Sequence, residues 1–365
     1  MKNFWKNLPK PFYVLAPMAD VTDAAFRQII NKYGKPDVFW TEFVAADGLA
    51  HPKAREKLMI DLKYSEGEHP IVAQIFGGKP ENIKTAAALC QELGFDGVDI
   101  NMGCPDRAIE RQCAGSAMIK NPELAKAVIR AAKEGAPNIP ISVKTRIGYN
   151  KNEIDTWIRE ILSEDIAALT VHLRTRKEMS DVPAHWELMK SIVEIRDELD
   201  KASSVAGLRP RNTLIIGNGD ATDLEDAKKK VTETGCDGVM LGRAIFGNPW
   251  LFNREIVSKE YGYFSTEKFL VLEPSLSQAS LKTTSLQKPF PSVSEKLRVL
   301  VEHTKLFEEM LGEYKNFAIM KKHYKAYVNG FDGAKELRMK LMEAENADEI
   351  ASIVNAFCEN LSEKV

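Results

Sequence analysis

Cys104 has the most pronounced chemical character in this sequence, and it lies in the segment NMGCPDR. A short apolar run precedes the segment and Pro105 follows the cysteine, so we expect the chain to leave a strand and turn there. With an ordinary pKa of about 8.5, the thiol is mostly protonated at neutral pH and could act as a nucleophile or a general acid. The alternative is an inert buried cysteine. Residues 105–120 are predicted to form a loop over this site.

Polar side chains also follow most of the other short apolar runs in the chain. They are Glu42, Gln74, Asn101, Lys144, Arg146, His172, Arg174, Asn218, Asp220 and Arg243. A single polar residue after a strand is usually a turn or a surface group. Charged groups that converge from many strands destabilise a fold unless a ligand satisfies them. The sequence therefore predicts a functional pocket where these residues meet.

Two glycine-containing segments, GNGDAT (217–222) and LGRAIFGNP (241–249), are the last of these sites along the chain. Glycine lets backbone N–H groups approach a phosphate closely, and Arg243 can add a charge-assisted hydrogen bond. Tight turns alone would also account for the glycines. Because an arginine follows one of them, we expect a phosphorylated cofactor or substrate to bind here.

Lys144 and His172 leave several roles open. An ammonium at Lys144 could stabilise the negative charge that develops on a flavin upon reduction, could form a Schiff base, or could pair with a carboxylate such as Asp99. His172 could bind phosphate, donate to a flavin carbonyl, or be a hydrogen-bonded core histidine.

The elements that must position these residues alternate between strand and helix patterns. The β-rich runs are 14–18, 38–43, 71–77, 97–103, 141–148, 168–172, 214–220 and 238–243. Amphipathic stretches with Pro near the start or Gly at the end separate several of them. Eight such units in about 250 residues predict a (β/α)8 TIM barrel, with a doubly wound sheet as the alternative. In a barrel, the carboxyl ends of all the strands meet at one face.

The pattern changes after this region, which predicts a second domain. We expect a catalytic barrel over residues 1–255, a linker or insertion over 256–294, and a helical domain over 295–365. Residues 263–294 are rich in Ser, Thr and Pro and show no clear period, whereas strand signals are missing from the sequence beyond Glu295.

Composition limits the classes of protein that this chain could be. It has 365 residues, 44% of them hydrophobic, with 50 Lys+Arg against 52 Asp+Glu and a net charge of −2, which excludes a polycation. Five scattered cysteines without a CxxC motif argue against a disulfide framework or a zinc site. The sequence contains no apolar run of the roughly 20 residues needed to cross a bilayer. We expect a cytoplasmic monomer without a metal ion or a membrane segment.

The motifs together resemble those of the tRNA-dihydrouridine synthase family. They are VLAPMADVTDAAFR, TEF, AQIFGG, GVDINMGCP with AGSAMI, SVKTRIG, LTVHLRTR, IIGNGDATD and GVMLGRAIFGNPWLF. The resemblance covers about Val14 to Phe252 and resumes in KNFAIMKKHYKAYVNGFDGAKELRMKLMEAENADEI, which is similar to the helical domain of that family.

The resemblance implies an FMN-binding (β/α)8 barrel that uses NADPH to reduce uridines in tRNA. It places Pro17, Met18 and Ala19 at the flavin ring, Gln74 and Lys144 at its polar edge, His172 at ring and phosphate, and Asn218, Gly219, Asp220, Gly242 and Arg243 at the ribityl chain and phosphate. Cys104 would be the general acid that protonates C5 of uracil while hydride reaches C6. Such chemistry suits a loop that closes over a flipped-out base. We expect substrate contacts from Asn101, Arg146, Arg174, Lys321, Lys322 and Lys325.

The tRNA partner has separate support in the stretch 315–340. It contains seven Lys or Arg residues against two Asp or Glu, a local charge of +5, interleaved with the aromatic residues Tyr314, Phe317, Tyr324 and Tyr327. Such a surface suits phosphates and splayed bases, although a solvated helix face would show the same pattern.

The sequence also departs from the family pattern. Leu173 stands where a glycine is usual, residues 180–186 differ, and 191–213 and 263–294 are longer than expected. Two other functions fit the same residues: a flavin barrel that oxidises or reduces a small pyrimidine-like metabolite, and a tRNA-binding protein without catalysis.

Overall fold

The computed structural model describes residues 3–254 and 291–362. Eight strands form one parallel sheet: β1 (Phe12–Leu15), β2 (Phe39–Ala45), β3 (Ile71–Phe76), β4 (Gly97–Met102), β5 (Ile141–Arg146), β6 (Ala168–His172), β7 (Leu214–Asn218) and β8 (Gly238–Leu241). β1 pairs in parallel with β8, and a further parallel bridge joins Val14 to Val38 just before β2, so the sheet closes on itself. The predicted (β/α)8 barrel is confirmed.

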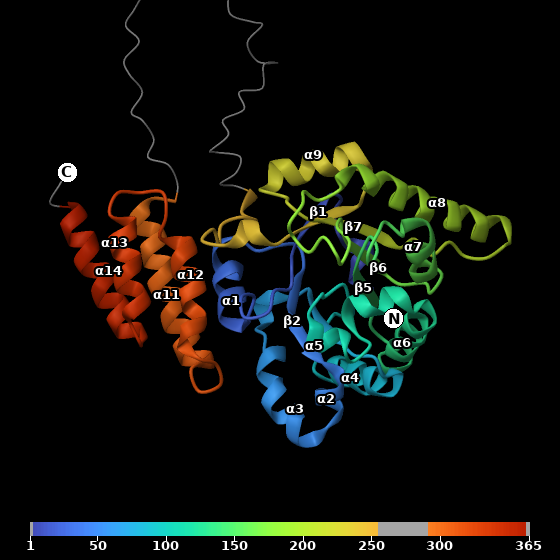
Figure 1. Cartoon of the computed structure of the whole chain (residues 1–365), viewed down its shortest axis with the longest axis horizontal. Helices are drawn as coiled ribbons and strands as arrows, with labels where there is room; N and C mark the ends of the chain where they lie inside the picture. The colour runs from blue at the N-terminus through green and yellow to red at the C-terminus, as the bar shows by residue number, and fades with distance from the viewer. Residues whose placement is uncertain (1–2, 255–290, 363–365) are drawn as a thin grey trace, which may run out of the picture.

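Helices follow the strands and cover the outside of the barrel (Figure 1). They are α1 (Ala24–Tyr33), α2 (Ala46–Ala50), α3 (Pro52–Leu58), α4 (Pro80–Glu92), α5 (Arg107–Glu110), α6 (Pro122–Gly135), α7 (Ile154–Leu162), α8 (Met189–Val205) and α9 (Leu224–Thr234). Side-chain hydrogen bonds and glycine conformations determine where several of these helices begin or end. The side chain of Asp23 accepts from the Phe26 amide at the start of α1, and Gly235 ends α9 in the left-handed conformation with φ of 74°.

Two hydrophobic clusters hold the barrel together. The larger one packs the outer faces of the strands against the helices. The smaller one is built mainly from alternate strand residues, including Phe12, Val14, Trp40 and Ile216, and fills the barrel interior. Trp5, in the short 3-10 helix η1 (Phe4–Asn7), joins this inner cluster from the N-terminal segment. The filled lower interior leaves the carboxyl ends of the strands as the face where a ligand can bind.

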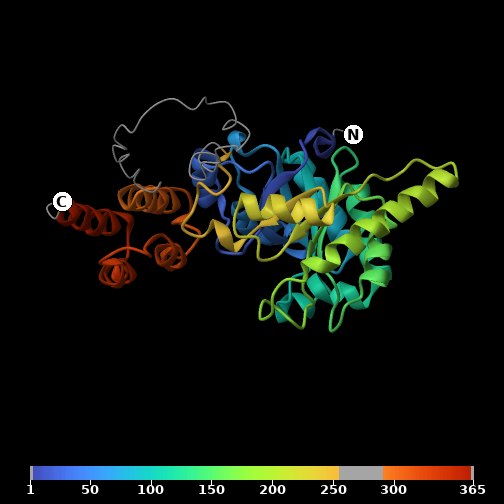
Figure 2. The same cartoon turned by 90° about the horizontal axis from the view of Figure 1, so that it is seen from above.

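Two segments differ in detail from the expectations. The predicted loop 105–120 contains α5 and a 3-10 helix, η4 (Gly115–Lys120), so it is compact. The long connection 191–213 is taken up largely by α8, which extends away from the barrel (Figures 1 and 2). Of the predicted linker 256–294, residues 256–290 lie outside the described residues.

The C-terminal part of the chain forms a group of helices beside the barrel (Figure 2). They are α11 (Val293–Leu311), the 3-10 helix η8 (Phe317–Ile319), α12 (Met320–Tyr327), α13 (Ala334–Glu343) and α14 (Ala347–Ser362). A capping box between Ser292 and Glu295 starts α11. We call residues 293–362 the helical domain.

The helical domain packs against α1 of the barrel. Phe26 of α1 lies 4.8 Å from the ring of His303 and 4.7 Å from the ring of His323. Tyr324 and Tyr327 are buried beside this contact, at 0% and 1% exposure, so they are unable to stack on RNA bases. Two of the four interleaved aromatic residues therefore belong to the core, whereas Phe317 is partly buried and Tyr314 is 64% exposed. Sequence periodicity alone had not separated these two environments.

One ion pair across this interface is largely buried. The Lys315 ammonium lies 2.6 Å from Glu42 at the end of β2 and 2.8 Å from Asp61 of the 3-10 helix η2 (Met59–Leu62). The side chains of Lys315 and Glu42 are 11% and 6% exposed. The two carboxylates raise the pKa of Lys315 despite its burial. Lys315 therefore joins the two domains and is not a free cation for RNA.

Replacement of Lys315 by Met should destabilise the protein, because it leaves the Glu42 carboxylate buried without its charged partner. We expect a loss of about 3 kcal/mol in the free energy of unfolding, measured by urea denaturation. Lys32→Met is the matched control, since Lys32 makes an exposed ion pair with Glu302 across the same interface. It should cost less than about 1 kcal/mol. Equal losses in the two variants would contradict this account of Lys315.

Candidate functional site

A pocket of about 260 Å³ opens at the carboxyl ends of the strands. It is lined by Ala16, Pro17, Met18, Lys144, His172, Arg174, Ser180, Asn218, Gly219, Asp220, Ala221, Met240, Gly242 and Arg243. The lining comes from the ends of β5 to β8 and from the loop after β1. The register explains this gathering, because Arg146 pairs with His172, His172 with Asn218, and Asn218 with Met240 on successive strands.

Asp220 organises one end of the pocket. Its two carboxylate oxygens accept from Arg174 Nη2 and Arg243 Nη2, each at 2.5 Å. Hydrogen bonds to Arg174 and to the Ala184 amide keep the pKa of Asp220 below its ordinary value, although partial burial opposes this. The two guanidinium groups are therefore held side by side with a net charge of about +1.

Backbone donors lie beside these two arginines. Within residues 3–254 and 291–362, the amide N–H groups of Gly219, Asp220, Gly242 and Arg243 donate to no acceptor. Gly219 has φ of +129°, and a Cβ placed there would come within 2.7 Å of the Ala184 Cβ. Glycine is thus required at this turn, and Gly219 lines the pocket. Free amides next to two arginines are typical of a phosphate site.

His172 lies next to this end of the pocket as a neutral base. Burial lowers its pKa far below the ordinary value, and the nearby cations Lys144, Arg146, Arg174 and Arg243 lower it further. Its Nε2 lies 3.0 Å from Arg174 Nη1. Because arginine can only donate, Nε2 accepts and the ring proton is on Nδ1. His172 therefore keeps one N–H to donate.

Lys144 lies on the pocket wall and donates to Asn218 Oδ1 at 3.1 Å. Burial and the charge of Arg146 lower the pKa of Lys144 to about 8. No carboxylate of the described residues forms an ion pair with its ammonium, although the nearby charge of Asp99 partly opposes the lowering of the pKa. A lysine held in this state is a cation that an anionic ligand would stabilise.

Cys104 lies next to the pocket on the loop after β4, half-buried. Its amide donates to Asn101 Oδ1 at 2.9 Å, and its carbonyl oxygen lies 2.9 Å from both the amide and the hydroxyl of Ser116. Burial is the main cause that raises the pKa of the thiol above its ordinary value. The thiol is therefore protonated at neutral pH. The backbone that carries it is held by hydrogen bonds on both sides.

One bidentate ion pair, a cation–π contact and a hydroxyl hydrogen bond hold the Cys104 loop in place. Arg176 binds the carboxylate of Glu110 through Nε at 3.0 Å and Nη2 at 2.5 Å. The same guanidinium lies 5.5 Å from the ring centre of Tyr149. Glu110 also accepts from Ser116 at 2.9 Å. The loop is thus anchored to the segments that follow β5 and β6.

The predicted contacts divide into three groups. The pocket contains Pro17, Met18, Lys144, His172, Asn218, Gly219, Asp220, Gly242 and Arg243 among the predicted cofactor residues, and Arg174 among the predicted substrate residues. Gln74 and Asn101 lie on β3 and β4 beside Cys104, outside the pocket lining. Ala19 is exposed, one residue beyond the lining.

Arg146 and Arg174 are already occupied by the protein. Arg146 donates to the carbonyl oxygens of Gly103, Thr175 and Met179 at 2.8 to 3.0 Å and is 6% exposed. Arg174 donates to the Val182 carbonyl at 2.6 Å as well as to Asp220. These arginines fix loops around the site, and their contact with substrate stays a prediction.

The predicted lysines of α12 are near the surface. Lys322 and Lys325 are exposed, and Lys321 is half-buried. Lys322 lies 3.4 Å from Asp20, which follows Met18 closely in the loop after β1. α12 therefore lies close to the mouth of the barrel, and its role in RNA binding stays a prediction.

Residues 173–186 contain contacts that the sequence did not reveal. Ala184 donates its amide to Asp220 at 2.8 Å, and Trp186 Nε1 donates to the Gly219 carbonyl at 2.7 Å. Ser180 lines the pocket. This segment has no periodic pattern that could have indicated these roles. Leu173, which replaces a usual glycine, is fully buried in the larger hydrophobic cluster and so does not narrow the pocket.

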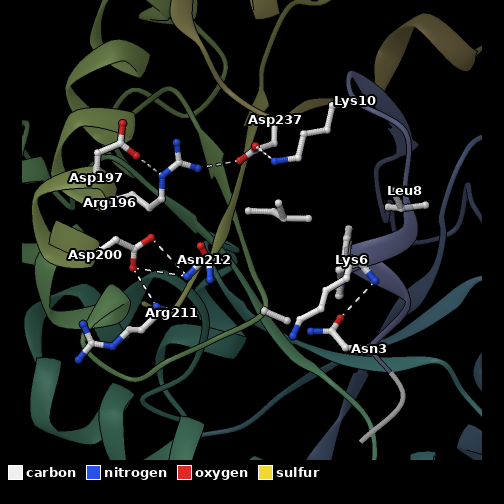
Figure 3. Close-up of a pocket in the computed structure, with 13 residues that line it drawn as sticks. Asn3, Lys6, Leu8, Lys10, Arg196, Asp197, Asp200, Arg211, Asn212 and Asp237 are labelled. Carbon is white, nitrogen blue, oxygen red and sulfur yellow. Dashed lines mark hydrogen bonds and ion pairs between the residues drawn. The ribbon is translucent and has the colours of Figure 1, made fainter. Parts of the chain in front are cut away.

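A larger pocket of about 550 Å³ lies at the opposite, N-terminal end of the strands (Figure 3). Its charged groups neutralise one another: Asp237 binds Lys10 at 2.5 Å and Arg196 at 2.9 Å. Asp200 accepts from the amide of Arg211 at 2.9 Å. Polar groups at this end of a barrel generally serve stability. We therefore place the functional site at the other end.

Two further features bear on the class of site. No group of three or more His, Cys, Asp or Glu residues that could hold a metal ion occurs within residues 3–254 and 291–362. In the same part of the chain, every helix is too short or too polar to span a bilayer.

Comparison with known proteins identifies the family. The family described as Dihydrouridine synthase (Dus) matches residues 14–364. The chain is 37% identical over 366 residues to a probable tRNA-dihydrouridine synthase of Staphylococcus aureus (strain Mu50 / ATCC 700699), with 100% of this chain and 98% of that protein covered. It is 39% identical over 358 residues to a probable tRNA-dihydrouridine synthase 2 of Bacillus subtilis (strain 168), with 98% and 97% covered.

Among solved structures, morphinone reductase in complex with tetrahydroNAD aligns with a TM-score of 0.46 and 13% identity, over 70% of this chain and 89% of that one. This likeness is too weak to support a functional conclusion. The match to the family and the two full-length identities do support one. The chain belongs to the dihydrouridine synthase family of flavin-dependent oxidoreductases.

Proposed function

We propose that this protein reduces the C5–C6 double bond of particular uridines in tRNA, with FMN as cofactor and NADPH as the source of electrons. The single observation that carries the proposal is the position of Cys104, a protonated thiol beside a pocket suited to a phosphorylated ligand, in a chain of the dihydrouridine synthase family.

The residues of the pocket fit FMN. Arg243, Arg174 and the free amides of Gly219 and Gly242 would hold the phosphate at one end. Lys144 is a cation on the same wall, where it would stabilise negative charge on the polar edge of the ring. When bound and reduced by NADPH, FMN would supply the hydride that C6 of the uracil requires.

Cys104 would supply the proton. Hydride addition to C6 places negative charge on C5 and the neighbouring carbonyl oxygen, and a thiol at C5 neutralises this charge by giving up its proton. Hydride and proton together account for the two hydrogens of the product. The raised pKa of Cys104 suits an acid, whereas a nucleophilic cysteine needs a lowered pKa.

The helical domain would hold the tRNA. Lys322 and Lys325 expose ammonium groups on α12, near the loop after β1 that lines the pocket. Exposed cations next to an active-site mouth can bind backbone phosphates while one base enters the pocket.

Replacement of Cys104 by Ala should lower the rate of dihydrouridine formation about 10²- to 10⁴-fold, because the proton donor is lost. The assay is mass spectrometry of an unmodified tRNA after incubation with FMN-loaded protein and NADPH. The FMN content should stay unchanged. Cys113→Ser, on the same loop, is the control and should keep the activity. A normal rate in Cys104→Ala would show that this residue is not the acid. Turnover of free uracil instead of tRNA would favour a small-metabolite enzyme.

The protonation state of Cys104 can be measured directly. Because burial raises its pKa, alkylation of Cys104 by iodoacetamide should have a midpoint above the ordinary thiol value of about 8.5. Site-resolved mass spectrometry across pH 6 to 10 gives this midpoint, with the urea-unfolded protein as reference. A midpoint below the reference would indicate a nucleophile.

Arg243→Ala should weaken FMN binding by about 1.5 to 3 kcal/mol, which is roughly 10- to 150-fold in Kd, because a charge-assisted bond to the phosphate is lost. Riboflavin lacks the phosphate, so its affinity should not change. Flavin fluorescence titration of the apoprotein measures both. Arg254→Ala is the control, since Arg254 is also partly exposed and pairs with Asp37. Equal effects on FMN and riboflavin would contradict the phosphate assignment.

A further inference from the structure

Asp99 is a fully buried acid on β4, and the chemistry proposed above does not use it. It forms no ion pair within the described part of the chain. Instead, its two oxygens accept from Ser142 Oγ at 2.6 Å and from Gln74 Nε2 at 2.7 Å. A buried carboxyl group destabilises a fold unless its hydrogen bonds are satisfied, so its presence in the barrel calls for a reason.

A chain of hydrogen bonds leads from Asp99 to the backbone of Cys104. Gln74 Oε1 accepts from Asn101 Nδ2 at 3.1 Å. Asn101 Oδ1 accepts from the amides of Gly103 at 3.1 Å and Cys104 at 2.9 Å. The side chains of Asp99, Gln74 and Asn101 are all buried, at 0%, 0% and 6% exposure. Buried hydrogen bonds in a connected network polarise and strengthen one another, so the loss of one weakens its neighbours.

The direction of every bond in this chain is fixed by its two ends. An ionised Asp99 can only accept, so Gln74 must turn its NH₂ group toward it. The amides of Gly103 and Cys104 can only donate, so Asn101 must turn its oxygen toward them. Only one orientation of each carboxamide connects these ends. If Gln74 were reversed, its oxygen would face the Asp99 carboxylate without a hydrogen between them.

We propose that Asp99 is a positioning residue: through Gln74 it fixes the orientation of the Asn101 carboxamide and thereby the backbone at Cys104. This inference rests on the proposed function for its consequence in catalysis. Ser116 donates to the Cys104 carbonyl oxygen, and Asn101 accepts from the Cys104 amide. The backbone from which the thiol side chain extends is therefore held on both sides.

The same constraint determines what Gln74 and Asn101 can offer to a ligand. Each carboxamide nitrogen has two hydrogens and uses one of them within the chain. Gln74 is fully buried, so of the two only Asn101, which is 6% exposed, could donate its remaining N–H to a carbonyl oxygen of a ligand. A reversed chain would present an oxygen there and would repel such a carbonyl group.

Two substitutions separate this role from simple support of the fold. Asp99→Asn is close in shape and can still accept from Gln74 while donating to Ser142, so the direction of the chain is kept. Asp99→Val removes the acceptor in a residue that suits a strand. Asp99→Ala makes the same test without added bulk if the valine variant does not fold.

The first measurement is hydrogen exchange of the FMN-free protein, followed by mass spectrometry of peptides that cover residues 101–106. We expect the Gly103 and Cys104 amides to exchange about tenfold or more faster in Asp99→Val, and as in the unmodified protein in Asp99→Asn. Peptides from β1 and β6 serve as controls and should not change. Equal protection of 101–106 in all variants would overturn the proposal, as would a loss in Asp99→Asn equal to that in Asp99→Val.

The second measurement is single-turnover reduction of tRNA uridine with FMN-loaded protein. The rate should fall at least tenfold in Asp99→Val or Asp99→Ala and recover in Asp99→Asn. A rate that is normal in the valine and alanine variants would contradict the catalytic consequence. If the unmodified protein does not reduce tRNA, the proposed function fails, whereas hydrogen exchange still decides the role of Asp99.

Discussion

The site depends on the closure of one parallel sheet. The pairing of β1 with β8 and the bridge from Val14 to Val38 complete the ring. Since all strands run in the same direction, their carboxyl ends meet at one face, whatever the distance in sequence between them. Cys104 and Arg243 belong to the same site for this reason. The inner cluster fills the lower barrel, and the pocket that these residues line or adjoin opens at this face.

Positive charge is concentrated at that face beyond what the protein itself neutralises. Lys144, Arg146, Arg174 and Arg243 all act on the pKa of His172, while Asp220 is the carboxylate that binds two of them. The fold tolerates this arrangement because Asp220 and several backbone carbonyls fix the guanidinium groups in place. A bound phosphate, as proposed above, would balance the remaining positive charge.

The positively charged residues of the helical domain serve two purposes: some pair with the barrel, and others are exposed to solvent. The net charge of +5 over residues 315–340 includes Lys315, whose ammonium is paired with the carboxylates of Glu42 and Asp61. Glu42 also accepts from the Asp20 amide at 2.5 Å, so the ion pair ties the helical domain to the loop that lines the pocket. The exposed lysines Lys322 and Lys325 of α12 and Lys335 and Lys340 of α13 are left for an external partner. Charge counts along a sequence do not separate these two uses, because they carry no information on burial.

Much of the architecture followed from sequence patterns that depend on local physics. Apolar runs and capped amphipathic helices repeat at the spacing of a (β/α)8 barrel, so all eight strands were expected near their observed places. The residues that follow them, such as His172 and Asn218, could be predicted to converge, since a closed parallel sheet leaves them no other arrangement. The loop after β4 was expected to present Cys104, because Pro105 ends the strand pattern.

Tertiary structure decided which of these polar residues are free. Arg146 is held by three backbone carbonyls, Lys315 by two carboxylates, and Tyr324 is packed in a core, although each looked like a binding residue in the sequence. The contacts of Ala184 and Trp186 with Asp220 and Gly219 come from a segment without periodicity. Hydrogen bonds and burial depend on distances between segments far apart in the chain. The sequence by itself determined the fold and the residues that meet at the mouth of the barrel. The packing determined which of these residues are buried, which are held by other protein groups and which are free to bind a ligand.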